Sequence, residues 1–534
     1  MSLFQAEDIT ASYLRAGVRT TLLSGASFSL EAGGVYDLVG PSGSGKSTLL
    51  RVCARMLARD GGELFLDGAP SSSFEPVQWR RRVCLVPQQP ALVGGTVRAN
   101  LLLPWTLSVN AGSAPPAEGD LERLLEAADL HDVELGRNAA QLSGGQAARV
   151  ALLRAFATRP RVLLLDEVDA ALDDESACAV GRLTKALVGT RMTCLRIRHR
   201  AADGFASGTF ALRGGALSYA DNPPHSGGTA CTEGFDPADY AALGRLSAPL
   251  GACGRRGLHG RRGAARMNGG VVDIGYVELF AASALMLVAG LVSWKLELGQ
   301  TKRIVVSSVR TFVQLLAAGF VLMYLFQYQT WWLVLLALGA MVLAATQIAT
   351  SRVKSSLKGL WPAVFVSLFA SSVAVGFVVV EGVIHADPWY NARQVIPIAG
   401  MIIGNAMSAT AVAIDRLFAD LESRSDEMFT LVALGATAKE AAFPSLKAAI
   451  GAGMTPILAS MSAAGIVTIP GMMSGQLLAG ADPLAAAKYQ IVVMLMLSAA
   501  NTVAIVMACY LTYRKRFSAS GYYVDKGIRD DNPL

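Results

Sequence analysis

Cysteine and histidine are scarce in this chain, and neither is spaced to hold a metal. The 534 residues include seven cysteines and five histidines. No C-x-x-C pair occurs, and no cysteine has a metal-ligand spacing with a histidine. The sequence therefore gives no sign of a Cys/His metal centre, and we expect its cysteines to be reduced cytosolic or buried thiols.

A signal peptide and a nucleic-acid-binding stripe are also missing. Residues 1–8 contain neither a basic segment nor an apolar one, so we expect no cleaved leader and a first domain in the cytoplasm. No basic stripe is interleaved with aromatic residues. Short basic loops between apolar runs account for the net charge of +6, and we expect no nucleic-acid partner.

Charged residues make up 16% of the chain and hydrophobic residues 52%, and the two are unevenly distributed. We expect a soluble domain over 1–220, a flexible Gly/Pro/Arg-rich linker over 221–275, a membrane domain over 276–517 and a cytoplasmic tail over 518–534. The linker arginines between 254 and 266 could contact anionic lipid headgroups, although a solvated tether is the simpler interpretation.

A phosphate-binding loop dominates the soluble half. Residues 40–48 match G-x-x-x-x-G-K-[S/T], after an apolar strand and before a helix. The glycines let backbone N–H groups approach a phosphate, and the helix N-terminus favours negative charge. The predicted ATP-binding residues are Gly40, Pro41, Ser42, Gly43, Ser44, Gly45, Lys46, Ser47 and Thr48. Lys46 would hold the β- and γ-phosphates and Ser47 would ligate Mg²⁺.

Three further strand ends supply polar groups that phosphoryl transfer needs. Asp166 and Glu167 follow the apolar run 162–165; we expect the first to order Mg²⁺ and the second to polarise the attacking water. Gln88 ends another apolar strand, where it could sense Mg²⁺ or that water. His199 ends a third. The predicted catalytic residues are Glu167, His199 and Gln88, and the predicted Mg²⁺ site is Ser47, Asp166 and Gln88.

The motif Leu-Ser-Gly-Gly-Gln predicts a second anion site at a helix N-terminus. It consists of Leu142, Ser143, Gly144, Gly145 and Gln146, which open a helix that reaches Thr158. One domain cannot bring this site to its own phosphate loop. The motif therefore implies a partner copy.

Seven apolar runs are long enough to span a bilayer: 276–294, 304–326, 330–349, 361–384, 395–414, 450–470 and 491–512. Basic residues follow the first, third, fifth and seventh runs. The positive-inside rule places these four basic segments in the cytoplasm. The first run would then start outside, although the soluble domain before it must lie inside. Either this run is re-entrant or interfacial, or the two halves become separate chains.

The loop 415–449 is the longest between runs. Apolar residues recur at helical spacing over 427–440, which predicts an amphipathic cytoplasmic helix that could couple the soluble domain to the spans. Polar and soft groups within the spans are candidate cargo ligands. Those singled out are Glu381, Met401, Met407, Met472 and Met473, together with Arg310, Gln314, His385 and Asp387.

Residues 3–217 resemble the nucleotide-binding domain of ABC transporters, with every motif present and in order. The resemblance implies an α/β P-loop NTPase fold, Tyr13 stacked on the adenine, Asp173 in the D-loop, and ATP and Mg²⁺ as cofactors. It also implies a homodimer in which two domains sandwich two ATP molecules. The chain departs from the family at Ala170, where Ser is usual, and at Arg198 and Arg200, where Thr or Ser and Asp are usual.

Residues 267–517 resemble the membrane subunit of Fet-type bacterial ABC systems, a family that includes plant aluminium-tolerance permeases. The stretches that carry the resemblance are 394–407, 434–437, 469–475, 488–490 and 508–515, and residues 95–105 resemble the partner ATPase. The resemblance implies an all-α polytopic domain and an ATP-driven half-transporter that exports iron or a related metal from the cytoplasm. An importer or a carrier of organic cargo, such as a nucleotide sugar, is the alternative; the absence of a substrate-binding domain favours export.

Overall fold

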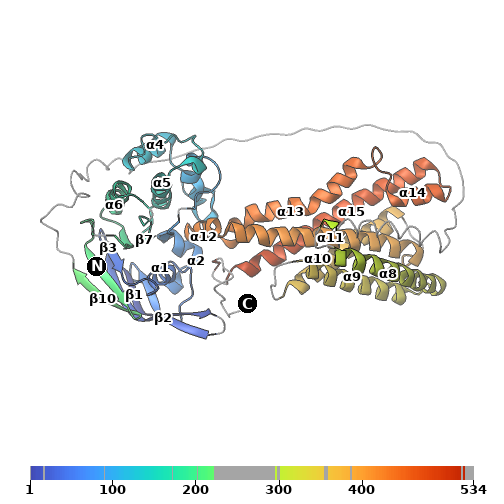
Figure 1. Cartoon of the computed structure of the whole chain (residues 1–534), viewed down its shortest axis with the longest axis horizontal. Coiled ribbons are helices and arrows are strands. Elements are labelled where there is room, and N and C mark those ends of the chain that lie inside the picture. Colours follow the sequence, from blue (N-terminus) through green and yellow to red (C-terminus); the bar gives the residue numbers. More distant parts are fainter. Residues whose placement is uncertain are drawn as a thin grey trace. The chain divides into compact units, whose positions relative to one another are not determined.

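The computed structural model describes residues 2–15, 18–89, 91–170, 172–200, 202–221, 295–296, 301–353, 359–384, 388–518 and 521–522. The chain divides into two compact units (Figure 1). The first consists of Met1–Arg255, Ala419–Ser445 and Tyr513–Leu534, and the second of Arg256–Phe418 and Leu446–Thr512. The long loop between membrane runs therefore belongs to the unit that carries the phosphate loop.

The first unit contains a six-stranded sheet of order β10-β9-β3-β8-β7-β6 and a four-stranded antiparallel sheet of order β2-β1-β4-β5. The strands are β1 Ser2–Arg15, β2 Val18–Glu31, β3 Val35–Val39, β4 Gly61–Leu66, β5 Ala69–Pro70, β6 Val83–Val86, β7 Val162–Asp166, β8 Thr193–Ile197, β9 Gly208–Arg213 and β10 Ala216–Asp221. Strands β3, β6, β7 and β8 run parallel. They are buried along nearly their whole length and most of their residues are apolar, as expected for parallel strands covered on both faces.

Helices and short 3₁₀ turns complete this unit. The helices are α1 Lys46–Cys53, α2 Pro76–Arg82, α3 Val97–Leu102, α4 Glu118–Ala127, α5 Gly144–Ala157, α6 Asp174–Val188 and α12 Ser425–Ala433. The 3₁₀ turns are η1 Ser71–Ser73, η2 Leu103–Thr106, η3 Ser108–Asn110, η4 Ala139–Gln141 and η7 Tyr513–Arg516. This arrangement confirms the predicted α/β class.

Cys178 on α6 is disulfide-bonded, so the prediction of reduced thiols is wrong for that residue. Four other described cysteines, Cys53, Cys84, Cys194 and Cys509, are free and buried, as predicted.

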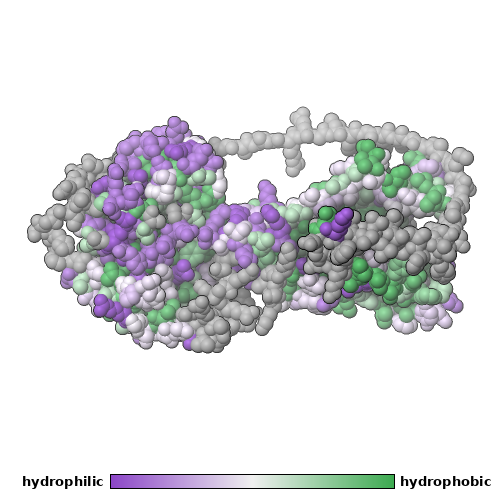
Figure 2. Space-filling view, in the orientation of Figure 1, coloured by the Kyte–Doolittle hydropathy of each residue, from purple (hydrophilic) through white to green (hydrophobic). Residues whose placement is uncertain are grey.

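The second unit is helical. Its helices are α8 Thr301–Tyr328, α9 Trp331–Arg352, α10 Leu360–Val379, which continues as the π-helix η6 Val380–Ile384, α11 Ala392–Ser423, α13 Ala438–Ala463, α14 Gly471–Leu478 and α15 Pro483–Thr512. Among the described residues, five helices are long and apolar enough to cross a membrane: α8, α9, α10, α11 and α15. Hydrophobic side chains gather on the surface of this unit, whereas the first unit is largely hydrophilic (Figure 2).

Two predicted segments are interrupted in the structure, and a third lies outside the described residues. The run 276–294 lies outside the described residues. The run 450–470 does not form one continuous helix, because α13 ends at Ala463 and an isolated bridge joins Ala464 to Thr468; the predicted bounds of this span are wrong. The helix predicted over 427–440 ends at Ala433 and restarts at Ala438, because Gly435 has a φ of +93°.

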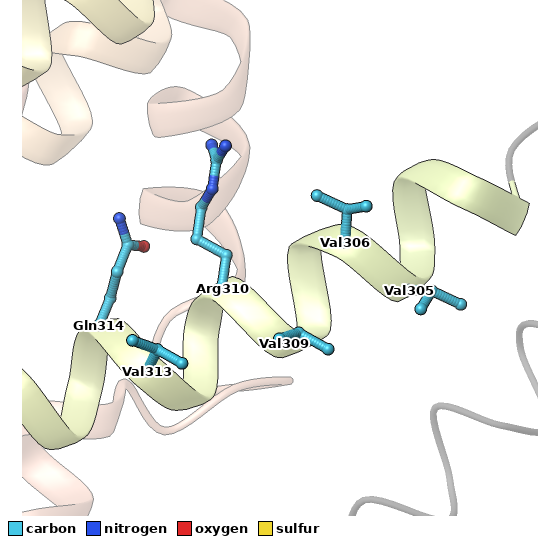
Figure 3. A pocket seen from close by; sticks show the side chains of 6 residues that line it. All are labelled: Val305, Val306, Val309, Arg310, Val313 and Gln314. Carbon is cyan, nitrogen blue, oxygen red and sulfur yellow. The ribbon is translucent and has the colours of Figure 1, made fainter.

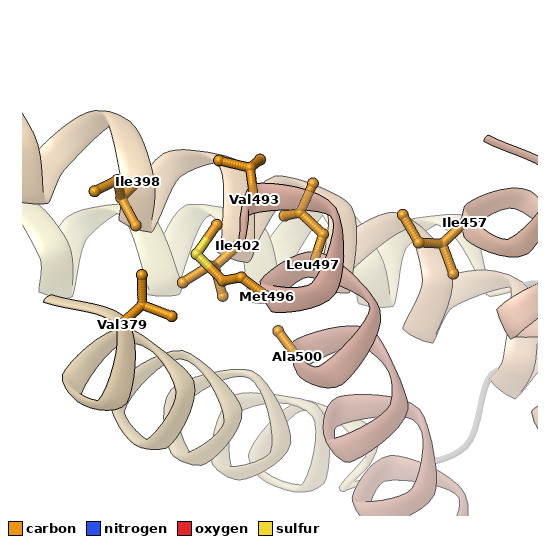
Figure 4. Packing of buried hydrophobic residues seen from close by; sticks show 8 residues of the cluster. All are labelled: Val379, Ile398, Ile402, Ile457, Val493, Met496, Leu497 and Ala500. Atoms are coloured by element: carbon orange, nitrogen blue, oxygen red, sulfur yellow. The ribbon is translucent and has the colours of Figure 1, made fainter. Parts of the chain in front are cut away.

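Helices α10, α11, α13 and α15 share an apolar core (Figure 4). Its buried members are Val379, Ile398, Ile402, Ile457, Val493, Met496, Leu497 and Ala500. Close to it, Gly453 of α13 faces α11 and α15: a Cβ there would lie 2.9 Å from Ala413 Cβ and 3.0 Å from both Ala409 O and Ile505 Cδ1. The absence of a side chain lets these helices approach one another closely.

We predict that Gly453→Ala lowers the stability of the membrane unit. The added methyl group overpacks the crossing of α11, α13 and α15, which costs about 1–3 kcal/mol. Gly451→Ala, two residues earlier on the same helix, is the matched control, because a Cβ there meets no atom within 4 Å. Thermal unfolding of the purified protein in detergent should give a lower melting temperature for Gly453→Ala only. Equal melting temperatures for the two variants would contradict this close packing.

Candidate nucleotide site and coupling segment

The predicted catalytic residues meet at one edge of the six-stranded sheet. Parallel strands place their carboxyl ends at the same edge, and β3, β8, β7 and β6 are adjacent in that order. The phosphate loop follows β3, His199 follows β8, Asp166 and Glu167 end β7, and Gln88 follows β6. Topology thus brings together side chains that are up to 159 residues apart in sequence.

The phosphate loop needs glycine at three described positions. A Cβ at Gly40 would lie 2.4 Å from Leu212 O, while Gly43 has a φ of +78° and Gly45, immediately before α1, a φ of +99°. The buried Lys46 Nζ donates to Gly40 O at 2.9 Å and Pro41 O at 3.1 Å, so the ammonium group lies over the loop. A cavity of about 400 Å³ opens here, lined by Leu22, Ser42, Gly43, Gly45, Lys46, Ser47, Thr48, Arg51, Leu57 and Glu167.

The two principal candidate Mg²⁺ ligands are already paired. Ser47 Oγ donates to Asp166 Oδ1 at 2.8 Å. Burial raises the pKa of the Asp166 carboxyl, while the hydrogen bond from Ser47 and the positive charge of Arg51 oppose that rise. A hydroxyl and a carboxylate oxygen are hard ligands suited to Mg²⁺, which would neutralise phosphate charge when bound with ATP. The described residues hold no group of three or more His, Cys, Asp and Glu that could bind a metal by themselves.

Glu167 is held from two sides. Gln88 Nε2 donates to Glu167 Oε2 at 3.1 Å, and His199 Nε2 lies 2.8 Å from Glu167 Oε1. The Glu167 backbone has a φ of +52°, which is uncommon for a residue with a side chain and costs on the order of 1–3 kcal/mol. The hydrogen bond of Gln88 therefore joins it to the proposed base, not to the Ser47–Asp166 pair.

The Leu-Ser-Gly-Gly-Gln motif opens α5 with a capping box. Ser143 Oγ accepts from Gln146 N at 3.3 Å, and Gln146 Oε1 accepts from Ser143 N at 3.0 Å. A Cβ at Gly145 would lie 2.8 Å from Ser176 Oγ on α6. Asp173 caps α6 through Ser176 N at 2.7 Å. Within the described part of the chain no hydrogen bond joins this motif to the phosphate loop, so a partner copy stays a prediction.

Tyr13 lies in β1, and its side chain falls outside the described part of the structure. Its contact with adenine therefore stays a prediction. His385 and Asp387 also lie outside the described residues.

The structure does not bring all the candidate cargo ligands together at one site. Met401 and Met472 pack against the core shared by α10, α11, α13 and α15. Met461 also packs against this core and Met496 is a member of it; the sequence did not single out these two methionines. Met407 and Met473 are half-buried elsewhere. Glu381 is exposed in η6, two residues after the core residue Val379.

Arg310 and Gln314 lie on one face of α8, as their spacing predicts (Figure 3). They line a shallow hollow of about 430 Å³ with Val305, Val306, Val309 and Val313, all from α8 itself. Both polar side chains are exposed within their unit. This hollow is separate from the core that holds Met401 and Met472.

The segment Ala419–Ser445 packs within the ATPase unit. Glu440 Oε1 accepts from Ser108 N at 2.5 Å, and Glu440 Oε2 accepts from Thr437 N at 2.8 Å. A Cβ at Gly435 would lie 3.2 Å from both Val77 O and Val109 Cγ1. Helix α12 also contacts α2 and β6. The turn at Gly435 thus fits closely against the region around α2 and η3.

Arg51 links this segment to the nucleotide cavity. It lies on α1, five residues after Lys46, and lines the cavity. Its guanidinium lies over the ring of Phe429 on α12, 5.4 Å from the ring centroid. Sequence analysis missed both Arg51 and Glu440, although the helical periodicity over 427–440 indicated the segment.

Comparison with known proteins identifies both halves. A model described as "Uncharacterised protein family (UPF0014)" matches residues 276–517, and a model described as "ABC transporter" matches residues 23–170. The "Probable iron export permease protein FetB" of Escherichia coli is 36% identical over 243 residues, covering 45% of this chain and 92% of that protein. The chain belongs to the UPF0014 family. It carries an ABC transporter ATPase on the same polypeptide, which confirms the predicted fusion.

Two other relatives match one half each. "Protein ALUMINUM SENSITIVE 3" of Arabidopsis thaliana is 33% identical over 244 residues, covering 46% of this chain and 88% of that protein. The human "ABC-type oligopeptide transporter ABCB9" is 37% identical over 201 residues, covering 36% of this chain but only 25% of that protein. The chain is therefore a membrane protein with an ABC ATPase domain.

We predict that Glu167→Gln binds ATP without turning it over. The amide keeps the size of the side chain but removes the charge that would polarise water, and loss of a general base typically costs 10²–10⁴-fold in rate. ATP hydrolysis by the purified full chain should fall by about that factor, while retention of labelled ATP rises. Glu134→Gln, a change at an exposed carboxylate between α4 and η4, is the control. Hydrolysis at the unmodified rate in Glu167→Gln would refute the assignment of the base.

Proposed function

We propose that this protein is an ATP-driven half-transporter that works as a homodimer and moves a metal ion out of the cytoplasm. The observation that carries the proposal is the packing of Ala419–Ser445 in the ATPase unit. This segment is a loop between two membrane helices, and its Phe429 contacts Arg51, which lines the nucleotide cavity. A change around the phosphates can therefore reach the membrane helices through one side chain.

Helix order supports a consistent topology. Ala419–Ser445 and Tyr513–Leu534 belong to the ATPase unit, so both lie on its side of the membrane, the cytoplasm. The stretch between these two segments must then cross the membrane outward and back. We assign the crossings to α13 and α15, with α14 between them, although α13 is not among the five helices that are long and apolar enough by composition. Helices α11, α10, α9 and α8 each cross the membrane once before the segment Ala419–Ser445. Four crossings place Thr301, at the start of α8, on the cytoplasmic side as well. This agrees with the basic residues that follow α9, α11 and α15.

The geometry of the site supports the following roles in the catalytic half of the cycle. Lys46 and the glycines of the phosphate loop would bind the β- and γ-phosphates, and Ser47 with Asp166 would hold Mg²⁺. Glu167, oriented by Gln88 and His199, would take a proton from the attacking water. Ser143 and Gly145 of a second copy would complete the site, because a helix N-terminus favours an anion.

The coupling half depends on α12. Arg51 lies between the cavity and Phe429, so phosphate charge entering the cavity would compete with the ring for the guanidinium. A cation–π contact is worth about 0.5–2 kcal/mol, enough to bias a two-state equilibrium several-fold. Glu440 and Gly435 fix the other end of the segment against Ser108 and Val77.

We predict that Phe429→Ala uncouples ATP hydrolysis from transport. The guanidinium of Arg51 would lose the ring it contacts, while the phosphate loop, Glu167 and His199 stay unchanged. In proteoliposomes, hydrolysis should continue but respond less to cargo, and transport per ATP should fall. Phe443→Ala on α13 is the matched control, because that ring is 53% exposed. The coupling role would be rejected if the two variants transported equally well.

The cargo is proposed from the relatives and from sulfur chemistry. The names of two relatives refer to iron export and to aluminium sensitivity. Four methionines, Met401, Met461, Met472 and Met496, share the core of α10, α11, α13 and α15. Thioether sulfur binds softer metals in preference to hard ones, which favours iron over aluminium as cargo. Glu381, exposed beside that core in a π-turn, is the charged candidate.

We predict ATP-dependent accumulation of ⁵⁵Fe in inverted membrane vesicles that contain the full chain. Inverted vesicles expose the ATPase to added ATP, so an exporter loads them. Lys46→Ala should abolish accumulation, because the ammonium group that would hold the phosphates is lost. Vesicles with the unmodified chain and a non-hydrolysable ATP analogue are the control.

The other outcomes select among alternatives. Intact ATPase activity without iron accumulation would overturn the iron proposal and favour an organic cargo. ATP-dependent release of preloaded iron from the same vesicles would indicate an importer. Hydrolysis that no cargo and no membrane-domain variant alters would favour an ABC ATPase that is merely anchored to the membrane.

A further inference from the structure

Two arginines flank His199, and both bind the segment that follows Glu167. Arg198 Nε donates to Asp169 Oδ2 at 2.9 Å. Arg200 Nε donates to Asp169 O at 3.2 Å, and its other nitrogens reach Leu172 O and Asp174 Oδ1. The strand end that carries the histidine is thus tied to residues 169–174, the D-loop and the first residue of α6.

A buried ion network anchors this link in the sheet. Arg198 Nη1 lies 2.8 Å from Asp203 Oδ2, and Arg196 binds the same carboxylate at 2.7 Å. Arg196 also donates to Asp37 on β3 at 2.6 Å. Arg196, Arg198, Asp37, Asp169 and Asp203 are all buried. Two cations and three carboxylates joined in this way hold the backbone on either side of His199 to Asp169, so the two segments would move together.

The contacts on Arg200 are more accessible. Its side chain is 27% exposed and that of Asp174 fully exposed. Arg200 therefore adds little to the core of the unit, yet it makes three contacts to one short segment. That segment contains Asp173, the N-cap of α6, whose neighbour Ser176 lies against Gly145 of the Leu-Ser-Gly-Gly-Gln motif.

We propose that Arg198 and Arg200 are positioning residues that lock the D-loop to the strand end bearing His199. The contact of His199 with Glu167 then depends on where Asp173 lies. This inference rests on the proposed function, because it assumes that Glu167 is the base and that the segment around Asp173 faces a second copy. If the second copy displaced that segment, the position of His199 relative to Glu167 would change. The rate of hydrolysis would then depend on closure of the dimer.

Arg200→Ala in the full chain tests the proposal. A small displacement of His199 should lower kcat for ATP hydrolysis about 10- to 100-fold, because misplacing a group by 1 Å can cost 10²-fold. KM for ATP should stay unchanged, because the phosphate loop is untouched. Arg200→Lys should restore part of the rate. Arg98→Ala, which removes an exposed ion pair with Glu118, is the matched control and should behave like the unmodified chain.

A double-variant experiment separates positioning from general damage. On a His199→Ala background, Arg200→Ala should cause no further loss, because the group it positions is gone. Asp174→Asn, a change at a fully exposed side chain that cannot disturb the core, should show the same dependence on His199 with a smaller effect.

Three results would overturn the proposal. They are losses that multiply in the double variant, a rise in KM equal to the fall in kcat, and an unchanged kcat in Arg200→Ala. If the unmodified chain does not hydrolyse ATP, the proposed function fails first, and the two failures remain distinguishable.

Discussion

The carboxylate of Glu167 lies between two hydrogen bonds, and the rest of the ATPase unit depends on this arrangement. Gln88 approaches from the end of β6 and His199 from the end of β8. Neither residue is near Glu167 in sequence; the parallel order β8-β7-β6 places them on either side. We propose Glu167 as a general base, and a general base works only within hydrogen-bond reach of its proton. Anything that moves β6 or β8 would then change the orientation of this base.

Strands β6 and β8, which flank β7, lead to different parts of the molecule. Strand β6 contacts α12, so the Gln88 side faces the segment that belongs to the membrane loop. Strand β8 continues into Arg198 and Arg200, so the His199 side is tied to the D-loop. Glu167 therefore lies where a signal from the membrane helices and a signal from a second copy would meet. Arg51, which lines the cavity, contacts Phe429 and so forms a further link to the same membrane loop.

The nucleotide site was predictable from sequence because its parts are local motifs with fixed strand context. The phosphate loop, Asp166, Glu167, Gln88 and His199 each follow an apolar strand, and parallel topology then brings them together. The contact of Arg51 with Phe429 joins residues 378 apart, and no local pattern encodes it. The interruption after Ala463 was missed because hydropathy counts Ile466 and Val467 as part of a span and does not register the turn at Gly465, whose φ is +81°.

Because the two halves are on one chain, the contacts around α12 need to supply less binding free energy. Between separate subunits, the contact would also have to offset the loss of translational freedom on association. On one chain the second binding event is intramolecular, with an effective concentration set by the connecting residues. A few contacts, namely Glu440 with Ser108, Gly435 against Val77 and Phe429 under Arg51, are then enough to hold the segment. A contact that needs no large binding energy can also be broken and remade in every cycle, and this is what a coupling element requires.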